Sequence, residues 1–169
     1  MTANLVAADW IKRIADEERK RDAVRAREEE IADRKTRLVR LNGQRLVEDL
    51  RATVIRDIDA FRAEFPGGRT PHIVLETTES QPGFVVLNQA PAGVSLAVMP
   101  NLANATIKCR YRFTTTNGLP PREETVELVF TGAGEDALQI RHSGTGQLYP
   151  TADALSEFLL VPVFTGRPR

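Results

Sequence analysis

The chain has 169 residues, of which 27% are charged and 41% hydrophobic, and its formal net charge is zero. This length suits one domain with a real core, or a small domain with an extension. The balanced charge argues against a nucleic-acid partner held by a basic patch, and a single cysteine excludes an intrachain disulfide.

The same composition limits compartment and cofactors. No apolar run approaches the roughly 18 residues of a membrane span, and the N-terminus lacks the basic region and apolar core of a signal peptide. We therefore expect a cytoplasmic protein with no membrane span. The only histidines, His72 and His142, show no zinc-ligand spacing, so we expect no metal and no cofactor.

Residues 1–65 predict a long, charged helical arm. The run from Asp16 to Arg37 is rich in Ala, Arg, Glu and Lys and contains no Gly or Pro, so its helix propensities sum favourably. Acid-before-base pairs four residues apart each add about 0.2–0.5 kcal/mol. These pairs are Glu17–Arg21, Glu30–Arg34 and Asp33–Arg37.

A thin apolar seam runs along this arm. Val24, Ile31 and Leu38 lie seven residues apart, a spacing typical of a coiled coil. The intervening positions Glu28 and Lys35 are charged, so the seam is only half formed. A solvated helix laced with salt bridges is the competing interpretation.

The arm begins with an apolar stripe at helical spacing, formed by Leu5, Val6, Trp10, Ile11 and Ile14. Exposed apolar patches usually mark an interface, and the single tryptophan is a plausible anchor for a partner or a second protomer. The alternative is that this stripe packs on the β domain of its own chain. The candidate interaction residues are Trp10, Ile14, Val24, Ile31 and Leu38.

The second half of the arm has the pattern of a helix packed on a core. Its apolar positions are Leu46, Leu50, Val54, Ile58, Phe61 and Phe65, widened by Val47 and Ile55. Asn42-Gly43 lies between the two halves of the arm, and Asn-Gly is a common helix breaker. We expect a continuous or kinked helix, with an αα-hairpin turning near Gly43 as the alternative. Pro66-Gly67-Gly68 should end the arm.

Residues 66–169 predict an antiparallel β domain. Short β-rich runs alternate with turn residues, which indicates a sheet of about six strands and not βαβ units. The expected strands are His72–Thr78, Phe84–Asn88, Gly93–Met99, Ala105–Thr115, Glu124–Thr131 and Ala137–His142, with Gln147–Tyr149 as a short edge. In the fourth, Ile107, Cys109, Tyr111 and Phe113 should share one face. The fold class is therefore α+β.

A short C-terminal helix should follow, spanning residues 151–160. Thr151 is the expected N-cap and Asp153 lies in the first turn, where the helix dipole favours an acid. Pro162 should end the helix, and Leu155, Phe158 and Leu159 should be buried.

No residue pattern in the β domain predicts catalysis. The row Lys108, Arg110 and Arg112 could bind phosphates, but acids on the next strand should pair with it across the sheet. Cys109 should be buried among apolar residues. The remaining candidates have ordinary structural explanations as strand edges, hairpin turns or loop acids: His72, His142, Gly132-Ala133-Gly134, Gly144-Thr145-Gly146, Glu76, Glu79, Glu135 and Asp136.

The preferred hypothesis is a non-enzymatic interaction or assembly module, in which the arm binds its own copy or the helix of another protein. Unpaired sheet edges are a second route to association. The alternative is a small-molecule or lipid-headgroup binding domain with a pocket between sheet and helix. A third hypothesis, an enzyme, has no support from particular residues.

Overall fold

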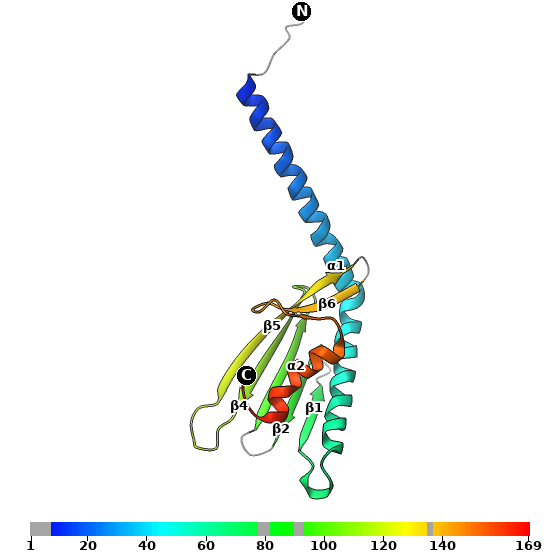
Figure 1. Cartoon of the computed structure of the whole chain (residues 1–169), viewed down its shortest axis with the longest axis vertical. Coiled ribbons are helices and arrows are strands. Elements are labelled where there is room, and N and C mark those ends of the chain that lie inside the picture. Colours follow the sequence, from blue (N-terminus) through cyan, green and yellow to red (C-terminus); the bar gives the residue numbers. More distant parts are fainter. Residues whose placement is uncertain (1–7, 78–81, 90–92, 135–136) are drawn as a thin grey trace, which may run out of the picture. The chain divides into compact units, whose positions relative to one another are not determined.

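The structure, a computed structural model, describes residues 8–77, 82–89, 93–134 and 137–169. It contains a long N-terminal helix, seven strands and a C-terminal helix (Figure 1). The α+β fold is therefore confirmed. The chain divides into two compact units, residues 1–37 and 38–169, and the boundary falls inside the first helix.

Helix α1 runs without interruption from Asp9 to Ala63, through Asn42 and Gly43. The alternative of a hairpin turning at Gly43 is therefore wrong. Gly43 is buried, and a Cβ atom at this position would lie 2.9 Å from Cδ2 of Leu102. The missing side chain lets α1 approach the turn after the third strand, so this glycine permits close packing. The helix stops three residues before Pro66, close to the predicted end.

The seven strands form one antiparallel sheet in which each strand pairs with its sequence neighbours, in the order β1-β2-β3-β4-β5-β6-β7. Their bounds are β1 Ile73–Thr77, β2 Phe84–Asn88, β3 Val94–Asn101, β4 Thr106–Phe113, β5 Arg122–Ala133, β6 Ala137–His142 and β7 Leu148–Tyr149. The sheet has seven strands and not about six, because the short edge expected at Gln147–Tyr149 forms a strand of its own, β7. The predicted antiparallel sheet is confirmed, and the other six strands lie where they were expected.

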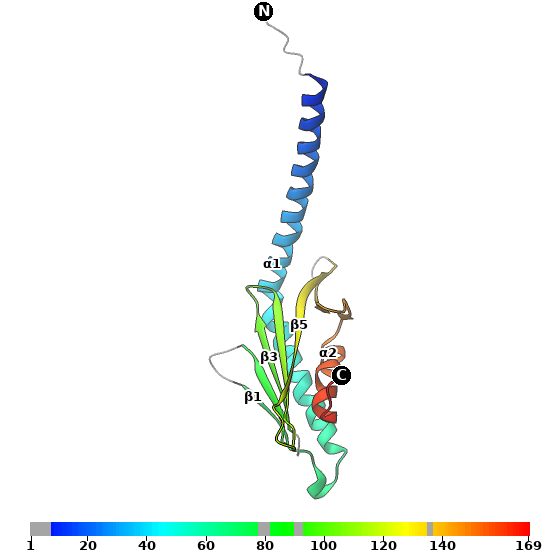
Figure 2. The same cartoon turned by 90° about the vertical axis from the view of Figure 1, so that its left-hand side faces the viewer.

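The core of residues 38–169 lies between one face of the sheet and two helices. The second half of α1 and the C-terminal helix lie on the same side of the sheet (Figure 2). From α1, Leu50, Val54 and Ile58 are buried in this core. The predicted packing of the helix through its C-terminal half is confirmed. On β4 the alternation is as predicted, since Ile107, Cys109, Tyr111 and Phe113 are all buried.

Helix α2 spans Ala152–Thr165 and begins as predicted, with the Thr151 hydroxyl accepting a hydrogen bond from the Ala154 N–H at 3.1 Å. The predicted end at residue 160 is wrong, because the helix continues through Pro162. A proline removes the N–H that would bond to the carbonyl four residues earlier. Here the Phe158 carbonyl accepts instead from the Arg169 guanidinium.

Other donors also serve the last turns of α2. The Tyr111 hydroxyl, on β4, donates to the Leu159 carbonyl at 2.6 Å. The Asn88 side chain, on β2, donates to the Val163 carbonyl at 2.8 Å. Gly166, in the left-handed region, donates to the Pro162 carbonyl and caps the helix. The sheet and the tail therefore stabilise a helix end that the local sequence disfavours.

Candidate interaction surface

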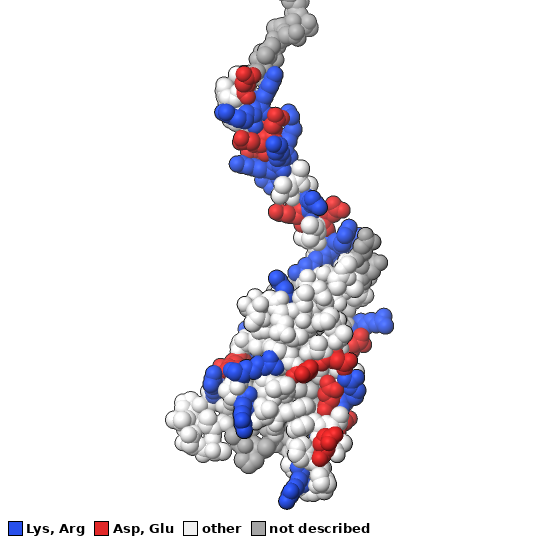
Figure 3. Space-filling view, viewed as in Figure 1, with Lys and Arg blue, Asp and Glu red and all other residues white. Residues whose placement is uncertain are grey.

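Residues 9–37 of α1, called the exposed segment below, form a helix without tertiary burial. None of these residues, all of which the structure describes, is buried, and 19 of the 29 are charged. Charged side chains crowd the surface of this segment (Figure 3). The helix here depends on local propensity and on contacts between successive turns.

The exposed segment carries four of the five predicted interaction residues. Trp10 is 58% exposed, Ile14 48%, Val24 57% and Ile31 63%. At 100° per residue these four side chains fall within an arc of about 100° on one side of the helix. We call this arc the seam face. Leu38 is different, since it is 8% exposed and begins the unit of residues 38–169.

Three further residues belong to the predicted apolar tip. Ile11 is 43% exposed, on the helix beside Trp10. Leu5 and Val6 lie outside the described residues. Large apolar side chains left in water are the usual mark of an interface.

The ion pairs of the exposed segment differ from the predicted ones. The pairs predicted four residues apart, Glu17–Arg21, Glu30–Arg34 and Asp33–Arg37, are not formed. Each observed pair joins an acid to the base three residues later: Asp16–Arg19 at 2.9 Å, Glu18–Arg21 at 3.1 Å and Asp22–Arg25 at 3.7 Å. Both spacings bring side chains together on a helix, so propensity alone did not decide between them.

Four cations in this segment form a pattern that sequence reasoning missed. Arg13, Lys20, Arg27 and Arg34 lie seven residues apart, all are exposed, and none forms an ion pair with any residue that the structure describes. We call them the cation stripe. The seven-residue spacing was visible in the sequence, but the search for apolar residues at that spacing passed over it.

The basic row on β4 lies on the face of the sheet opposite the core. Lys108 pairs in register with Glu127 and Arg112 with Glu123, but Arg110 stands opposite Thr125. The predicted acidic partner of Arg110 is therefore absent. Within the described part of the chain, none of the three cations forms an ion pair. The predicted cross-strand ion pairs are therefore not formed.

The residues considered for catalysis have structural surroundings. Cys109 is buried, and this burial raises the pKa of its thiol to about 12, which keeps it protonated and poorly nucleophilic. The His142 Nδ1 atom accepts hydrogen bonds from the N–H groups of Gly144 and Thr145, at 3.0 and 3.1 Å. His142 therefore orders the turn between β6 and β7.

The remaining candidates lie in strands, turns or undescribed segments. His72 precedes β1, and its carbonyl accepts a hydrogen bond from the N–H of Gln89. Gly132 and Ala133 end β5, Gly134 lies in the turn after it, and Glu76 lies within β1. Glu79, Glu135 and Asp136 lie outside the described residues. Among the residues with described positions, no cluster of His, Cys, Asp or Glu could hold a metal ion.

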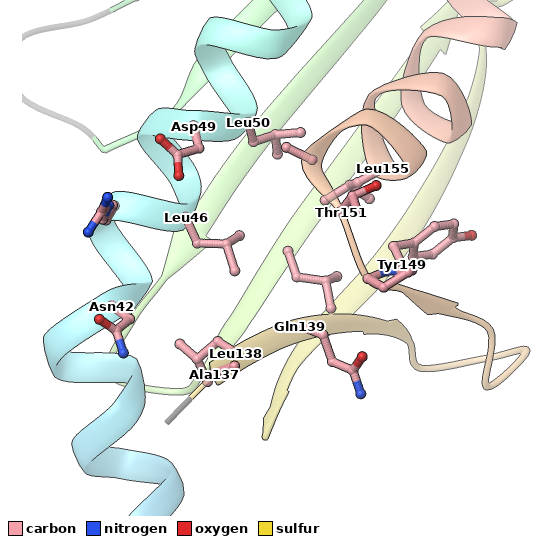
Figure 4. A pocket seen from close by; sticks show the side chains of 14 residues that line it. Asn42, Leu46, Asp49, Leu50, Ala137, Leu138, Gln139, Tyr149, Thr151 and Leu155 are labelled. Atoms are coloured by element: carbon pink, nitrogen blue, oxygen red, sulfur yellow. The ribbon is translucent and has the colours of Figure 1, made fainter. Parts of the chain in front are cut away.

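A pocket of about 300 Å³ opens between α1, β6 and the start of α2. Leu46 and Leu50 point from α1 toward this space, opposite Leu155 of α2 (Figure 4). Polar groups also line it, including Asn42, Arg45, Asp49, Gln139 and Thr151. The Tyr149 ring closes one side, with its hydroxyl directed away from the pocket. The lining is therefore mixed, with apolar walls and a few polar groups.

No model of a protein family matches this chain, and no curated protein or solved structure shows significant similarity to it. Among the helices that the structure describes, none is both long and apolar enough to cross a membrane. A functional proposal therefore has to start from the chain's own surfaces.

Proposed function

We propose that this protein is a non-enzymatic interaction or assembly module, whose exposed segment pairs with a helix of a second protomer or of another protein. The observation that carries the proposal is the seam face. Trp10, Ile14, Val24 and Ile31 stand in water on one side of a continuous helix. A helical segment that has no buried residue but carries large apolar side chains on one side is suited to a partner that covers that side.

The energy available from the seam face fits a reversible contact. Burying one fully exposed Val, Ile or Trp side chain contributes about 1.5–3 kcal/mol. The four seam-face residues are 48% to 63% exposed, so each would contribute only part of this energy. Association costs at least about 4 kcal/mol of lost freedom. Four anchors therefore leave a modest surplus, which favours regulated over permanent pairing.

A photocrosslinking experiment tests the proposal on the full chain. A photoreactive amino acid replaces Val24 on the seam face, and in a matched variant it replaces Ala26, which lies about 160° away on the same helix. Irradiation in extracts of the source cells should give a discrete protein adduct from position 24. Mass spectrometry then distinguishes a second copy of the chain from a foreign protein.

Position 26 is the control for reactivity of an exposed helix. A discrete adduct at position 24 and little at position 26 supports the proposal, whichever partner is found. Equal adducts at both positions, or none at either, count against pairing through the seam face. Light scattering of the full chain and its Trp10→Ala variant then reports whether the partner is a second copy.

The pocket between α1, β6 and α2 favours a second candidate function, binding of a small molecule or lipid headgroup. Its volume of about 300 Å³ lies at the lower end of the range for ligand sites. Thermal shift with nucleotides, lipid headgroups and common metabolites tests it, using Leu138→Trp to fill the pocket. A ligand that stabilises the native chain but not the filled variant supports this function, and no stabilisation by any ligand counts against it.

A further inference from the structure

The charges beside the seam face are unevenly distributed, with cations predominating on one flank, which also holds Asp9 and Asp16, and acids on the other, which also holds Arg25. On a helix with 100° per residue, the cation stripe of Arg13, Lys20, Arg27 and Arg34 lies directly beside Val24 and Ile31. A set of four exposed acids lies on the other side of the helix: Glu18, Asp22, Glu29 and Asp33. Whatever covers the seam face therefore meets cations along one flank over three heptads.

The cations of the stripe differ from the other arginines of this segment in their ion pairs. Arg19, Arg21 and Arg25, which lie off the stripe, each pair with an acid of their own helix. The four stripe cations pair with nothing in the described part of the chain. Asp16 is engaged with Arg19, and the other acids three or four residues from stripe cations, Asp9, Glu17 and Glu30, form no ion pair with any described residue, so the stripe remains available for an external anion.

A second copy of the helix matches this flank poorly. In heptad terms the stripe occupies the g positions, and charges at e and g select the partner and its direction. In an antiparallel pair, g faces g, so the stripe would meet its own copy. In a parallel pair, Arg13 would face Glu18, but Lys20 would face Arg25, and Arg21, Glu28 and Lys35 would each meet themselves in the seam. Like charges in such positions are destabilising.

An anionic membrane surface is also a poor match. Interfacial helices bury a broad apolar face, whereas the seam face holds four apolar residues in 29, interrupted by Glu17, Arg21, Glu28 and Lys35. A single narrow line with a charged flank has the dimensions of a helix–helix contact.

We propose that the occupant of the seam face is an acidic helix of another protein, one that places Asp or Glu residues opposite Arg13, Lys20, Arg27 and Arg34. This inference rests on the proposed function and names the chemistry of its partner. The acids neutralise the stripe while apolar residues of the partner cover Trp10, Val24 and Ile31. Electrostatic complementarity of this kind gives partner selection and rapid association more than raw affinity.

The single tryptophan supplies the readout, because Trp10 lies on the seam face and its emission reports whether that face is covered. The probe is a synthetic four-heptad helical peptide without tryptophan, with Leu at a and d and Glu at e and g. A matched peptide carries Gln at e and g. Added to the full chain at low salt, the Glu peptide should shift Trp10 emission and bind at least about tenfold more tightly than the Gln peptide.

Matched charge variants locate the interaction. Replacing Lys20, Arg27 and Arg34 with Gln removes three stripe cations. Affinity for the Glu peptide should then fall about tenfold, because each exposed ion pair changes affinity roughly threefold and salt screening reduces the combined effect. Replacing three cations elsewhere on the helix, Lys12, Arg19 and Arg37, with Gln should change affinity less than about threefold. Circular dichroism checks that both variants keep the helix.

Several outcomes overturn the proposal. Equal binding of the Glu and Gln peptides, or equal losses in the two charge variants, would mean that the stripe does not select the partner. A homo-oligomer dispersed by Trp10→Ala would identify a second copy as the occupant. A Trp10 shift with anionic vesicles but not with the Glu peptide would identify a membrane surface.

The outcome for the proposed function is separable. If a Val24→Ala, Ile31→Ala double variant weakens binding of the Gln peptide while the stripe variant has no effect, the seam face is an interaction surface and only its acidic partner is refuted. If neither peptide binds and position 24 gives no crosslink, both proposals fail together.

Discussion

The two halves of α1 share one continuous helix but not one physical basis. From residue 9 to 37, which the structure describes in full, no side chain is buried, and ion pairs join successive turns. From residue 38 to 63, Leu50, Val54 and Ile58 enter the core. The two halves are therefore both helical, but different interactions stabilise them. The first half leaves its large apolar side chains exposed, and the second half buries them in the core.

Substitution of one apolar residue in each half should show the largest contrast. Leu50→Ala leaves a cavity in the core and should lower the free energy of unfolding by about 2–5 kcal/mol. Ile31→Ala removes a side chain that is 63% exposed and should change it by less than about 0.5 kcal/mol. Urea titrations followed by circular dichroism measure both. A similar cost for the two variants would mean that Ile31 is packed within the chain.

Two glycines test how residues 38–169 tolerate crowding. A Cβ atom on Gly83 would lie 2.3 Å from the Val98 carbonyl oxygen, a backbone atom, whereas one on Gly43 would meet the rotatable end of Leu102. Gly83→Ala should therefore cost about 1–3 kcal/mol. Gly43→Ala should stay within about 1 kcal/mol of the native chain, because better helix propensity offsets the crowding. Thermal unfolding ranks them, and the reverse order would contradict the packing described for α1.

The features that depend on local pattern were predictable from the sequence. Alternation placed Ile107, Cys109, Tyr111 and Phe113 on one buried face of β4, because side chains of a strand alternate between two environments. The turn residues after Phe65 marked the end of α1 for the same local reason. The second half of α1 was identified as a packed helix by its apolar spacing.

The errors arose where distant residues decide. At Gly43 a hairpin was left open beside the favoured continuous or kinked helix, because the role of this glycine depends on Leu102, which the sequence does not bring beside it. Pro162 was taken as a helix end, but Arg169 and Tyr111 supply donors to the carbonyls around it. At the candidate surface, Trp10 and Ile31 were identified from apolar spacing, whereas the cation stripe was missed because charges were examined as pairs and not as rows.

The alkaline pH dependence of stability should come from the core. Burial raises the pKa of Cys109 to about 12, above the roughly 8.5 of an exposed thiol, and also raises that of Tyr111. The unfolded chain then loses the Cys109 proton first, so this stabilisation is complete below about pH 8.5 and is lost as pH rises toward 12. We expect a loss of about 1–2 kcal/mol between pH 8 and 10.

The control for this prediction is Cys109→Ala, which removes the thiol from both states. The free energy of unfolding, measured by urea titration at pH 7, 8, 9 and 10, should fall less steeply with rising pH for the variant than for the native chain. Residues 9–37 contain neither cysteine nor tyrosine, so they add no such term. Parallel slopes for the two proteins would show that Cys109 does not carry the effect.

The smallest effect concerns the local ion pairs of the exposed segment. Glu18 and Arg21 are joined at 3.1 Å with both side chains more than half exposed, and such a pair contributes about 0.3–0.5 kcal/mol to a helix. Glu18→Gln should therefore reduce amide-exchange protection around residue 18 about twofold. Glu29→Gln is the control, since Glu29 forms no ion pair with any described residue. Equal effects would mean that helix propensity, and not this ion pair, stabilises the first half of α1.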